Sequence, residues 1–114
     1  MDPWLCAELD DLAARMCKAL NDPKRLLILY ALNEGPCAVS ELCEILGAPQ
    51  SNISQHLAVL RDRGLVDTER QGNTVVYSLR HPKVLVAIDM LREVMADELR
   101  RQTERRSGPT RRRR

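Results

Sequence analysis

The amino-acid sequence predicts a mainly α-helical protein with one small β-hairpin, arranged as a winged helix-turn-helix. Three observations lead to this prediction. Residues 39–60 contain two short segments with the apolar spacing of amphipathic helices, joined by a glycine. Residues 65–79 contain two segments of strand composition around a Gly-Asn loop. Further amphipathic segments lie toward both termini, so helices are expected on either side of this central part.

The two central helices are predicted from their apolar spacing and from the residues at their ends. Gly47 can adopt the left-handed conformation that ends a helix, and Pro49 cannot continue that helix but can lie in the first turn of the next. Arg61–Gly64 is a basic helix end followed by a glycine stop. The expected buried residues are Val39, Leu42, Ile45 and Leu46 in the first helix and Ile53, Leu57 and Leu60 in the second.

The opposite face of the second helix is short, polar and nearly uncharged. It carries Gln50, Ser51, Asn52, Ser54, Gln55 and His56. Because such side chains both donate and accept hydrogen bonds, they suit the base edges in a DNA major groove. Two other interpretations stay open. The face could simply be solvated, or the helix could bind another protein, for which apolar or acidic residues would be expected there.

The strands Leu65–Arg70 and Thr74–Leu79 are expected to pair around the loop Gln71–Asn73, whose glycine and asparagine tolerate positive φ. A hairpin directly after two such helices is a wing, and its loop can reach a phosphate or the minor groove. The predicted DNA-binding residues therefore also include Arg61, Arg70 and Asn73. Other local cations available for DNA phosphates are Lys24, Arg25 and Arg63.

The terminal helices carry more apolar surface than so small a core can absorb. Asn21–Pro23 provides a helix stop, an Asx cap and a proline that starts the next helix, which ends at Glu34–Pro36; Pro82 opens the last helix. The helix after Asn21–Pro23 is expected to be a core helix with Leu26, Leu27, Leu29, Tyr30 and Leu32 buried. The apolar residues of the two terminal helices are Leu5, Leu9, Leu12 and Met16 in the first and Val84, Ile88, Leu91, Val94, Met95 and Leu99 in the last. We expect the first and last helices to form a dimer interface; the alternative is that they cap their own subunit.

Four stretches resemble the ArsR/SmtB-type winged-helix repressors of bacteria, which respond to metals, metalloids or thiol-reactive species. They are residues 21–29, 39–42, 50–66 and 72–79, and the resemblance runs from about Leu9 to Leu99. It implies a homodimer that binds double-stranded operator DNA as a repressor. It also implies that the repressor leaves the operator, or loses affinity for it, when an effector binds.

At 114 residues the chain has room for one domain, which we place at residues 1–104, before a basic tail at residues 105–114 that should be disordered. Residues 100–114 hold eight arginines against Glu104, a net charge of +7, whereas residues 1–99 hold ten basic and fifteen acidic residues, a net charge of −5. The tail either attracts DNA phosphates without sequence preference or serves only as a solubilising terminus.

Other classes of function are disfavoured. The sequence has no paired carboxylates, no Ser-His-Asp pattern, no glycine-rich phosphate loop and no metal-hydrolase motif, so we do not expect an enzyme. No apolar run is long enough to span a membrane and no signal peptide is present, so we expect a cytoplasmic protein without a membrane partner. Cysteines in that compartment are mostly reduced thiols.

The four cysteines, Cys6, Cys17, Cys37 and Cys43, are the candidates for metal or thiol sensing. The resemblance implies a Cys-x-Cys pair where this chain has Ala38 and Ser40, and zinc ligands on a last helix that here has no histidine, so neither site is expected. On a regular α-helix Cys6 and Cys17 would be about 20° out of phase and about 16 Å apart, too far to share one ion.

A sensing site must therefore combine cysteines from different segments, within one chain or across a dimer. Three thiolates would suit As(III) or a soft divalent metal such as Cd(II) or Pb(II), and two could form a disulfide or a persulfide switch. The alternative is that the cysteines only pack as small apolar residues. The repressor would then be controlled by another ligand or by none.

Overall fold

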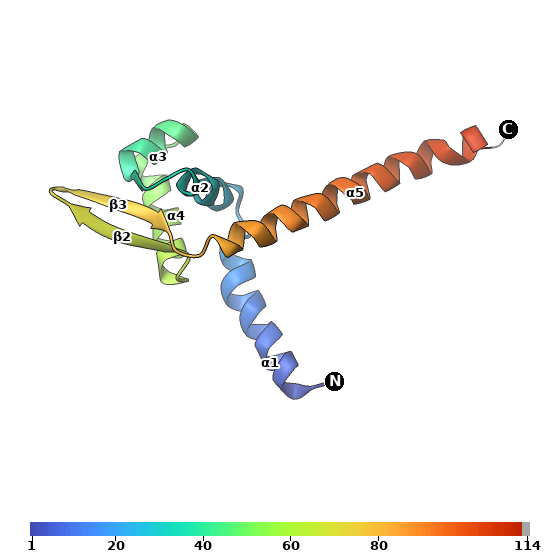
Figure 1. Ribbon diagram of the computed structural model, residues 1–114, viewed down its shortest axis with the longest axis horizontal. Helices are drawn as coiled ribbons and strands as arrows, with labels where there is room; N and C mark the ends of the chain where they lie inside the picture. Colours follow the sequence, from blue (N-terminus) through green and yellow to red (C-terminus); the bar gives the residue numbers. More distant parts are fainter. Residues whose placement is uncertain (113–114) are drawn as a thin grey trace. The chain divides into compact units, whose positions relative to one another are not determined.

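The computed structural model describes residues 1–112, with side chains described through Arg106. Its elements, shown in Figure 1, are α1 (Pro3–Asp11), the π-helix η1 (Leu12–Cys17), α2 (Pro23–Asn33), β1 (Cys37–Ala38), α3 (Val39–Leu46), α4 (Gln50–Asp62), β2 (Val66–Gln71), β3 (Thr74–Leu79) and α5 (Lys83–Arg112). The chain divides into two compact units, Met1–Pro82 and Lys83–Arg114. The predicted winged helix-turn-helix of mainly helical structure is confirmed.

The core of the first unit lies around α4. Ile53, Leu57 and Leu60, the three residues predicted to be buried in this helix, are all fully buried. The helix contacts α2, α3 and β2. These elements also contribute fully buried side chains, namely Ile28 and Leu29 from α2, Leu42 from α3 and Val66 from β2. One side of α4 is therefore enclosed by three neighbouring elements.

Two predicted core residues lie on the surface instead. Leu27 is 54% exposed, because the buried side of α2 consists of Ile28, Leu29 and Leu32 and leaves Leu27 on the outer side of the helix. Ile45 is 60% exposed. In α3 only Leu42 is fully buried, with Val39 and Leu46 half-buried, so the buried stripe passes to one side of Ile45.

The turn between α3 and α4 forms as expected. Gly47 has φ 63°, ψ 39°, the left-handed conformation, and its N–H donates to the carbonyl oxygen of Cys43. The N–H of Ala48 donates to the same oxygen at 3.2 Å, and the Ala48 side chain is buried. Pro49 is extended and directly precedes the first residue of α4, where its missing N–H costs no helical hydrogen bond.

The sheet has three antiparallel strands in the order β1-β3-β2, one more than predicted. β1 adds the pairs Cys37↔Tyr77 and Ala38↔Val76 to the edge of the hairpin. The hairpin itself runs from the pair Val66↔Leu79 to Gln71↔Thr74, which leaves a loop of Gly72 and Asn73. The observed strand bounds are thus displaced by one residue at β2 from the predicted Leu65–Arg70.

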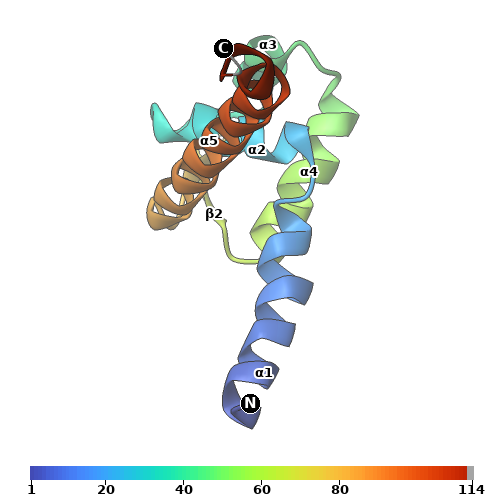
Figure 2. The ribbon, with the colours of Figure 1, turned by 90° about the vertical axis from the view of Figure 1, so that its right-hand side faces the viewer.

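The N-terminal segment is not one regular α-helix. The Asp2 carboxylate accepts a hydrogen bond from the N–H of Trp4 at 3.0 Å and begins α1, but from Leu12 the chain forms the π-helix η1. A π-helix bonds i to i+5, so the phase between Cys6 and Cys17 calculated for an α-helix does not hold. No residue of α1 is buried, and Figure 2 shows this helix projecting away from α2 and α4 of the same unit.

The second unit is α5, whose apolar residues are mostly exposed. Leu85 and Ile88 are buried, whereas Leu91, Val94, Met95 and Leu99 are between 56% and 66% exposed. Asp89–Arg92 and Glu98–Arg101 form ion pairs along the helix, at 2.9 and 3.2 Å, and Asp97 pairs with Arg100. Within the described part of the chain, no helix is long and apolar enough to cross a membrane.

α5 continues through residues 105–112, in the segment for which we predict disorder, and residues 113–114 lie outside the described part of the chain. The disordered tail stays a prediction.

Replacing Gly47 by alanine tests the conformational role of the turn. A Cβ at Gly47 would meet no atom within 4 Å, so any loss of stability reports the left-handed backbone and not a clash. We expect Gly47→Ala to lower the free energy of unfolding by about 1–2 kcal/mol in urea titrations. Gly47→Asn is the matched control and should lose less, because asparagine tolerates this conformation better. Equal losses for both variants would contradict the assignment.

Candidate nucleic-acid interface

The exposed side of α4 carries four of its six predicted base-reading residues. Gln50, Ser51, Ser54 and Gln55 are all exposed. Spacings of one, three and four residues place them on one continuous face of the helix, opposite the buried stripe. Their hydroxyl and amide groups supply both donors and acceptors to a groove.

Asn52 and His56 are placed differently. Asn52 is half-buried, and its Oδ1 atom is buried without a hydrogen-bond partner among the described residues. The side chain of His56 is only 15% exposed. Its predicted role in reading DNA stays a prediction, but the ring faces α2 and not the solvent. The reason is that the start of α2 offers the ring two polar partners, Asp22 and Arg25.

The wing and the end of α4 present the remaining predicted residues. Arg61 in the last turn of α4, Arg70 in β2 and Asn73 in the hairpin loop are exposed. Two other cations form ion pairs. Arg63 Nε lies 3.7 Å from Asp62 Oδ2, and Arg80 Nε lies 3.5 Å from Asp67 Oδ1. In the strand register Arg70 lies opposite Val75, one pair before the last pair of the hairpin, Gln71↔Thr74. The polar face of α4 is therefore followed along the chain by a wing that carries a cation beside its tip.

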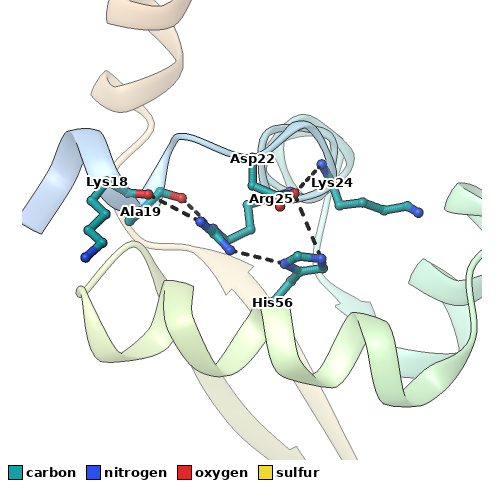
Figure 3. A network of polar contacts seen from close by, with 6 residues as sticks. All are labelled: Lys18, Ala19, Asp22, Lys24, Arg25 and His56. Atoms are coloured by element: carbon teal, nitrogen blue, oxygen red, sulfur yellow. Dashed lines mark hydrogen bonds and ion pairs between the residues drawn. The ribbon is translucent and has the colours of Figure 1, made fainter.

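A network of polar contacts, drawn in Figure 3, ties α4 to the start of α2. Arg25 Nη1 lies 3.3 Å from His56 Nδ1, and Asp22 Oδ1 lies 3.9 Å from His56 Nε2. Arg25 also donates from Nε to the carbonyl oxygen of Ala19 at 2.6 Å and from Nη2 to that of Lys18 at 3.3 Å. One guanidinium thus contacts the chain between η1 and α2 as well as the middle of α4.

Asp22 is the N-cap of α2. Its Oδ1 accepts from the backbone N–H of Lys24 at 2.8 Å and of Arg25 at 3.4 Å. Partial burial raises the pKa of this carboxyl, but the two backbone hydrogen bonds and the nearby charges of His56 and Arg25 outweigh it. The pKa of Asp22 therefore lies below its ordinary value. The carboxylate form is the one that caps the helix and faces His56.

The four cysteines are all free and differ in their exposure. Cys6 and Cys17 are exposed, Cys43 is half-buried in α3, and Cys37 is buried in β1. The Cys37 thiol donates to the carbonyl oxygen of Gly35 at 3.5 Å. Burial, and secondarily the negative charge of Glu41, raises the pKa of Cys37, so its reactive thiolate is disfavoured. In the described part of the chain, no three His, Cys, Asp or Glu residues are placed to hold a metal ion.

Sequence reasoning missed the contact between Arg25 and His56. The only local signal was Asn21–Pro23, which predicts a capped helix start and hence fixes where Asp22 and Arg25 lie on α2. The partner on α4 is 31 residues further along the chain and follows no periodic rule.

The fold and the exposed face of α4 define a class of protein. A helix-turn-helix with a polar outer face on its second helix and a wing after it is the arrangement of DNA-binding transcriptional regulators. Comparison with known proteins agrees. Residues 22–68 match the family described as bacterial regulatory protein, arsR family. The chain is 42% identical over 83 residues to the HTH-type transcriptional regulator YgaV of Escherichia coli K12, an alignment that covers 72% of this chain and 84% of YgaV.

Solved structures give the same result. Rv0081 of Mycobacterium tuberculosis is 35% identical, with a TM-score of 0.74 over 90% of this chain and 99% of that one. The homodimeric winged helix-turn-helix DNA-binding domain Mb0332 of Mycobacterium bovis is 29% identical, with a TM-score of 0.72 over 87% of this chain and 91% of that one. The chain belongs to the arsR family of bacterial regulatory proteins. It is a DNA-binding transcriptional regulator and not an enzyme.

The depressed pKa of Asp22 makes a prediction about acid stability. A carboxyl with a pKa lower in the folded than in the unfolded chain contributes stability that is complete above its unfolded pKa, about 3.9. That contribution is lost as the pH falls through the folded pKa. Asp22→Asn keeps a capping oxygen but does not titrate. The unmodified protein should have a higher free energy of unfolding than this variant near neutral pH, and we expect that difference to shrink as the pH falls below about 4. An advantage that does not change with pH would contradict this account of Asp22.

Proposed function

We propose that this regulator is a cytoplasmic homodimeric repressor that binds an inverted-repeat operator and is released by an effector acting on its cysteines. The observation that carries the DNA-reading part is the exposed polar face of α4, formed by Gln50, Ser51, Ser54 and Gln55. In this assignment that face enters the major groove. The DNA backbone or the minor groove beside it is contacted by Arg61, Arg70 and Asn73. The half-buried Asn52 and His56 contact DNA, in this assignment, from the edge of the same face of α4.

The proposed dimer is supported by the apolar surface of α5 and α1. Leu91, Val94, Met95 and Leu99 leave a stripe of α5 uncovered, and Leu5, Leu9 and Leu12 of the N-terminal segment are 39–49% exposed. Burial of such side chains against a second copy removes apolar area from water and stabilises the assembly. The neighbour Mb0332 is described as homodimeric. In a dimer of this kind, two α4 helices roughly 34–36 Å apart would meet successive major grooves.

The proposed sensor uses thiols from more than one segment. In the part of the chain that the structure describes, no three such ligands lie together, so we assign a metal such as As(III) or a soft divalent ion to cysteines from two chains. A disulfide or persulfide needs only two thiols. Among Cys6, Cys17, Cys37 and Cys43, we place the main role on Cys43, because it lies in the helix that supports α4 and its carbonyl oxygen receives the hydrogen bonds of the turn. The burial of Cys37 favours a packing role for that residue.

The assignment of α4 as the reading helix predicts a specific loss of discrimination. Gln55→Ala should reduce the preference for operator over random DNA by about 1–3 kcal/mol, the scale of one good base contact. Arg70→Ala is the matched comparison. It should weaken binding to all sequences alike and flatten the salt dependence, because it removes a phosphate contact. Fluorescence anisotropy at several salt concentrations measures both. Unchanged operator preference in Gln55→Ala would exclude this face as the reader.

The dimer proposal predicts a contrast between two positions of α5. Leu91 is 66% exposed in the single chain, so Leu91→Asp would cost little in a monomer but would bury an unpaired charge in a dimer. We expect this variant to sediment as a monomer or to unfold. Ala96→Asp is the control, because Ala96 lies on the side of α5 with Asp89 and Glu93, and it should remain dimeric. If Leu91→Asp also sediments as an intact dimer, the interface lies elsewhere.

Thiol sensing predicts that DNA binding and release can be separated. Cys43→Ser should bind operator DNA as the unmodified protein does, yet respond less to the inducer. The measurement is release of operator DNA from the reduced protein by As(III), Cd(II), an oxidant or polysulfide, compared in parallel. Cys37→Ser is the control, because its burial favours a packing role for Cys37, and this variant should keep the full response. If a protein with all four cysteines replaced still releases DNA fully, thiol sensing is wrong and the repressor is controlled by another ligand.

A further inference from the structure

Arg25 occupies a position that neither its neighbours in sequence nor its charge would predict. As a cation near α4, the half-buried Arg25 would be expected from its charge to contact DNA phosphate. Its guanidinium instead makes three contacts inside the protein, one from each nitrogen, to Ala19, Lys18 and His56. Figure 3 shows these contacts pointing in two directions, toward the chain that follows η1 and toward α4.

Only arginine can make this set of contacts. The planar guanidinium holds its N–H donors in a fixed fork, so two nitrogens reach the carbonyl oxygens of Lys18 and Ala19 while the third reaches the imidazole. Lysine has one nitrogen at the end of a flexible chain and cannot span the three acceptors in this geometry. The contact therefore depends on the shape of the side chain as well as on its charge.

The contact also determines how the His56 ring carries its proton. A guanidinium N–H can only donate, so the neutral form of His56 that accepts this hydrogen bond has Nδ1 unprotonated. The neutral ring then holds its proton on Nε2, the nitrogen that faces the Asp22 carboxylate at 3.9 Å. Asp22 and Arg25 therefore favour one orientation of the ring, Asp22 from the N-cap of α2 and Arg25 from its first turn.

We propose that Arg25 is a positioning residue for DNA reading, which holds α4 through His56 and joins it to the end of the N-terminal helical segment. His56 directly follows Gln55, so a fixed ring at position 56 sets the rotation of α4 where Gln55 faces outward. Reading of base edges tolerates errors of only about 0.5 Å or 10–20° in such a side chain. Because Lys18 and Ala19 directly follow η1, a displacement of that segment would change the contacts of Arg25 and hence of α4.

This inference rests on the proposed reading of DNA by α4, and Arg25→Lys tests it. The variant keeps the positive charge, so a direct contact with phosphate, and the slope of binding against salt, would be retained. We expect operator affinity to fall about tenfold or more, the scale of one hydrogen bond to a charged group, with nonspecific affinity nearly unchanged. If Arg25 served only to stabilise the fold, Arg25→Lys would lower the melting temperature. At temperatures well below that melting temperature, the ratio of operator affinity to nonspecific affinity would then be unchanged.

A double-mutant cycle with His56 tests whether Arg25 affects DNA reading through the His56 ring. His56→Leu should lose operator preference as Arg25→Lys does, and the double variant should lose little more than either. His56→Gln keeps an acceptor for Arg25 and a donor for Asp22, so it should retain most of the preference. Additive losses, or equal effects of leucine and glutamine, would overturn the proposal.

Nitrogen-15 NMR of the imidazole provides a signature that does not depend on DNA. In the unmodified protein at a pH where the ring is neutral, we expect Nε2 to carry the proton and Nδ1 to be free. Arg25→Lys should mix the two tautomers. The opposite tautomer, or operator preference unchanged in Arg25→Lys, would overturn the positioning role alone. Absence of operator preference in the unmodified protein would overturn the reading of DNA by α4 and the positioning role with it.

Discussion

The complete burial of one side of α4 is the constraint on which the rest of the structure depends. Ile53, Leu57 and Leu60 are enclosed by α2, α3 and β2, and full burial of each such side chain stabilises the fold by about 1.5–3 kcal/mol. Because these residues repeat at helical spacing, their burial leaves the opposite side of α4 in solvent. The same packing that stabilises the domain therefore decides which side chains can reach DNA.

Polar interactions at the ends of the helices then determine how α4 is held. Gly47 lets α3 stop and the chain turn within three residues, which keeps α3 against α4. Asp22 caps α2 and, with Arg25, holds His56 from the other side. Apolar packing alone allows a helix to rotate slightly at low cost, whereas directional contacts at the turn and at His56 restrict that rotation. A regulator can use such contacts, because a change at one end of the network alters the reading helix.

Periodicity and turn chemistry predicted the helix-turn-helix, the hairpin and the buried stripe of α4, because these follow from local spacing. The features that were missed depend on distant partners. β1 has two residues and exists only through its pairing with Val76 and Tyr77. Leu27 and Ile45 are as apolar as their buried neighbours, and only the packing of α2 and α3 decides which are covered. His56 belongs by composition to the polar face, and its contact with Arg25 was invisible in the sequence for the same reason.

The central claim is that two copies of this chain read one operator through α4. Titration of the DNA upstream of its own gene with the reduced protein, followed by anisotropy and native mass spectrometry, tests it most directly. The account predicts two chains per site and a preference over random DNA of about a thousandfold or more. One chain per site, or affinity for random DNA equal to that for the upstream sequence, would contradict it.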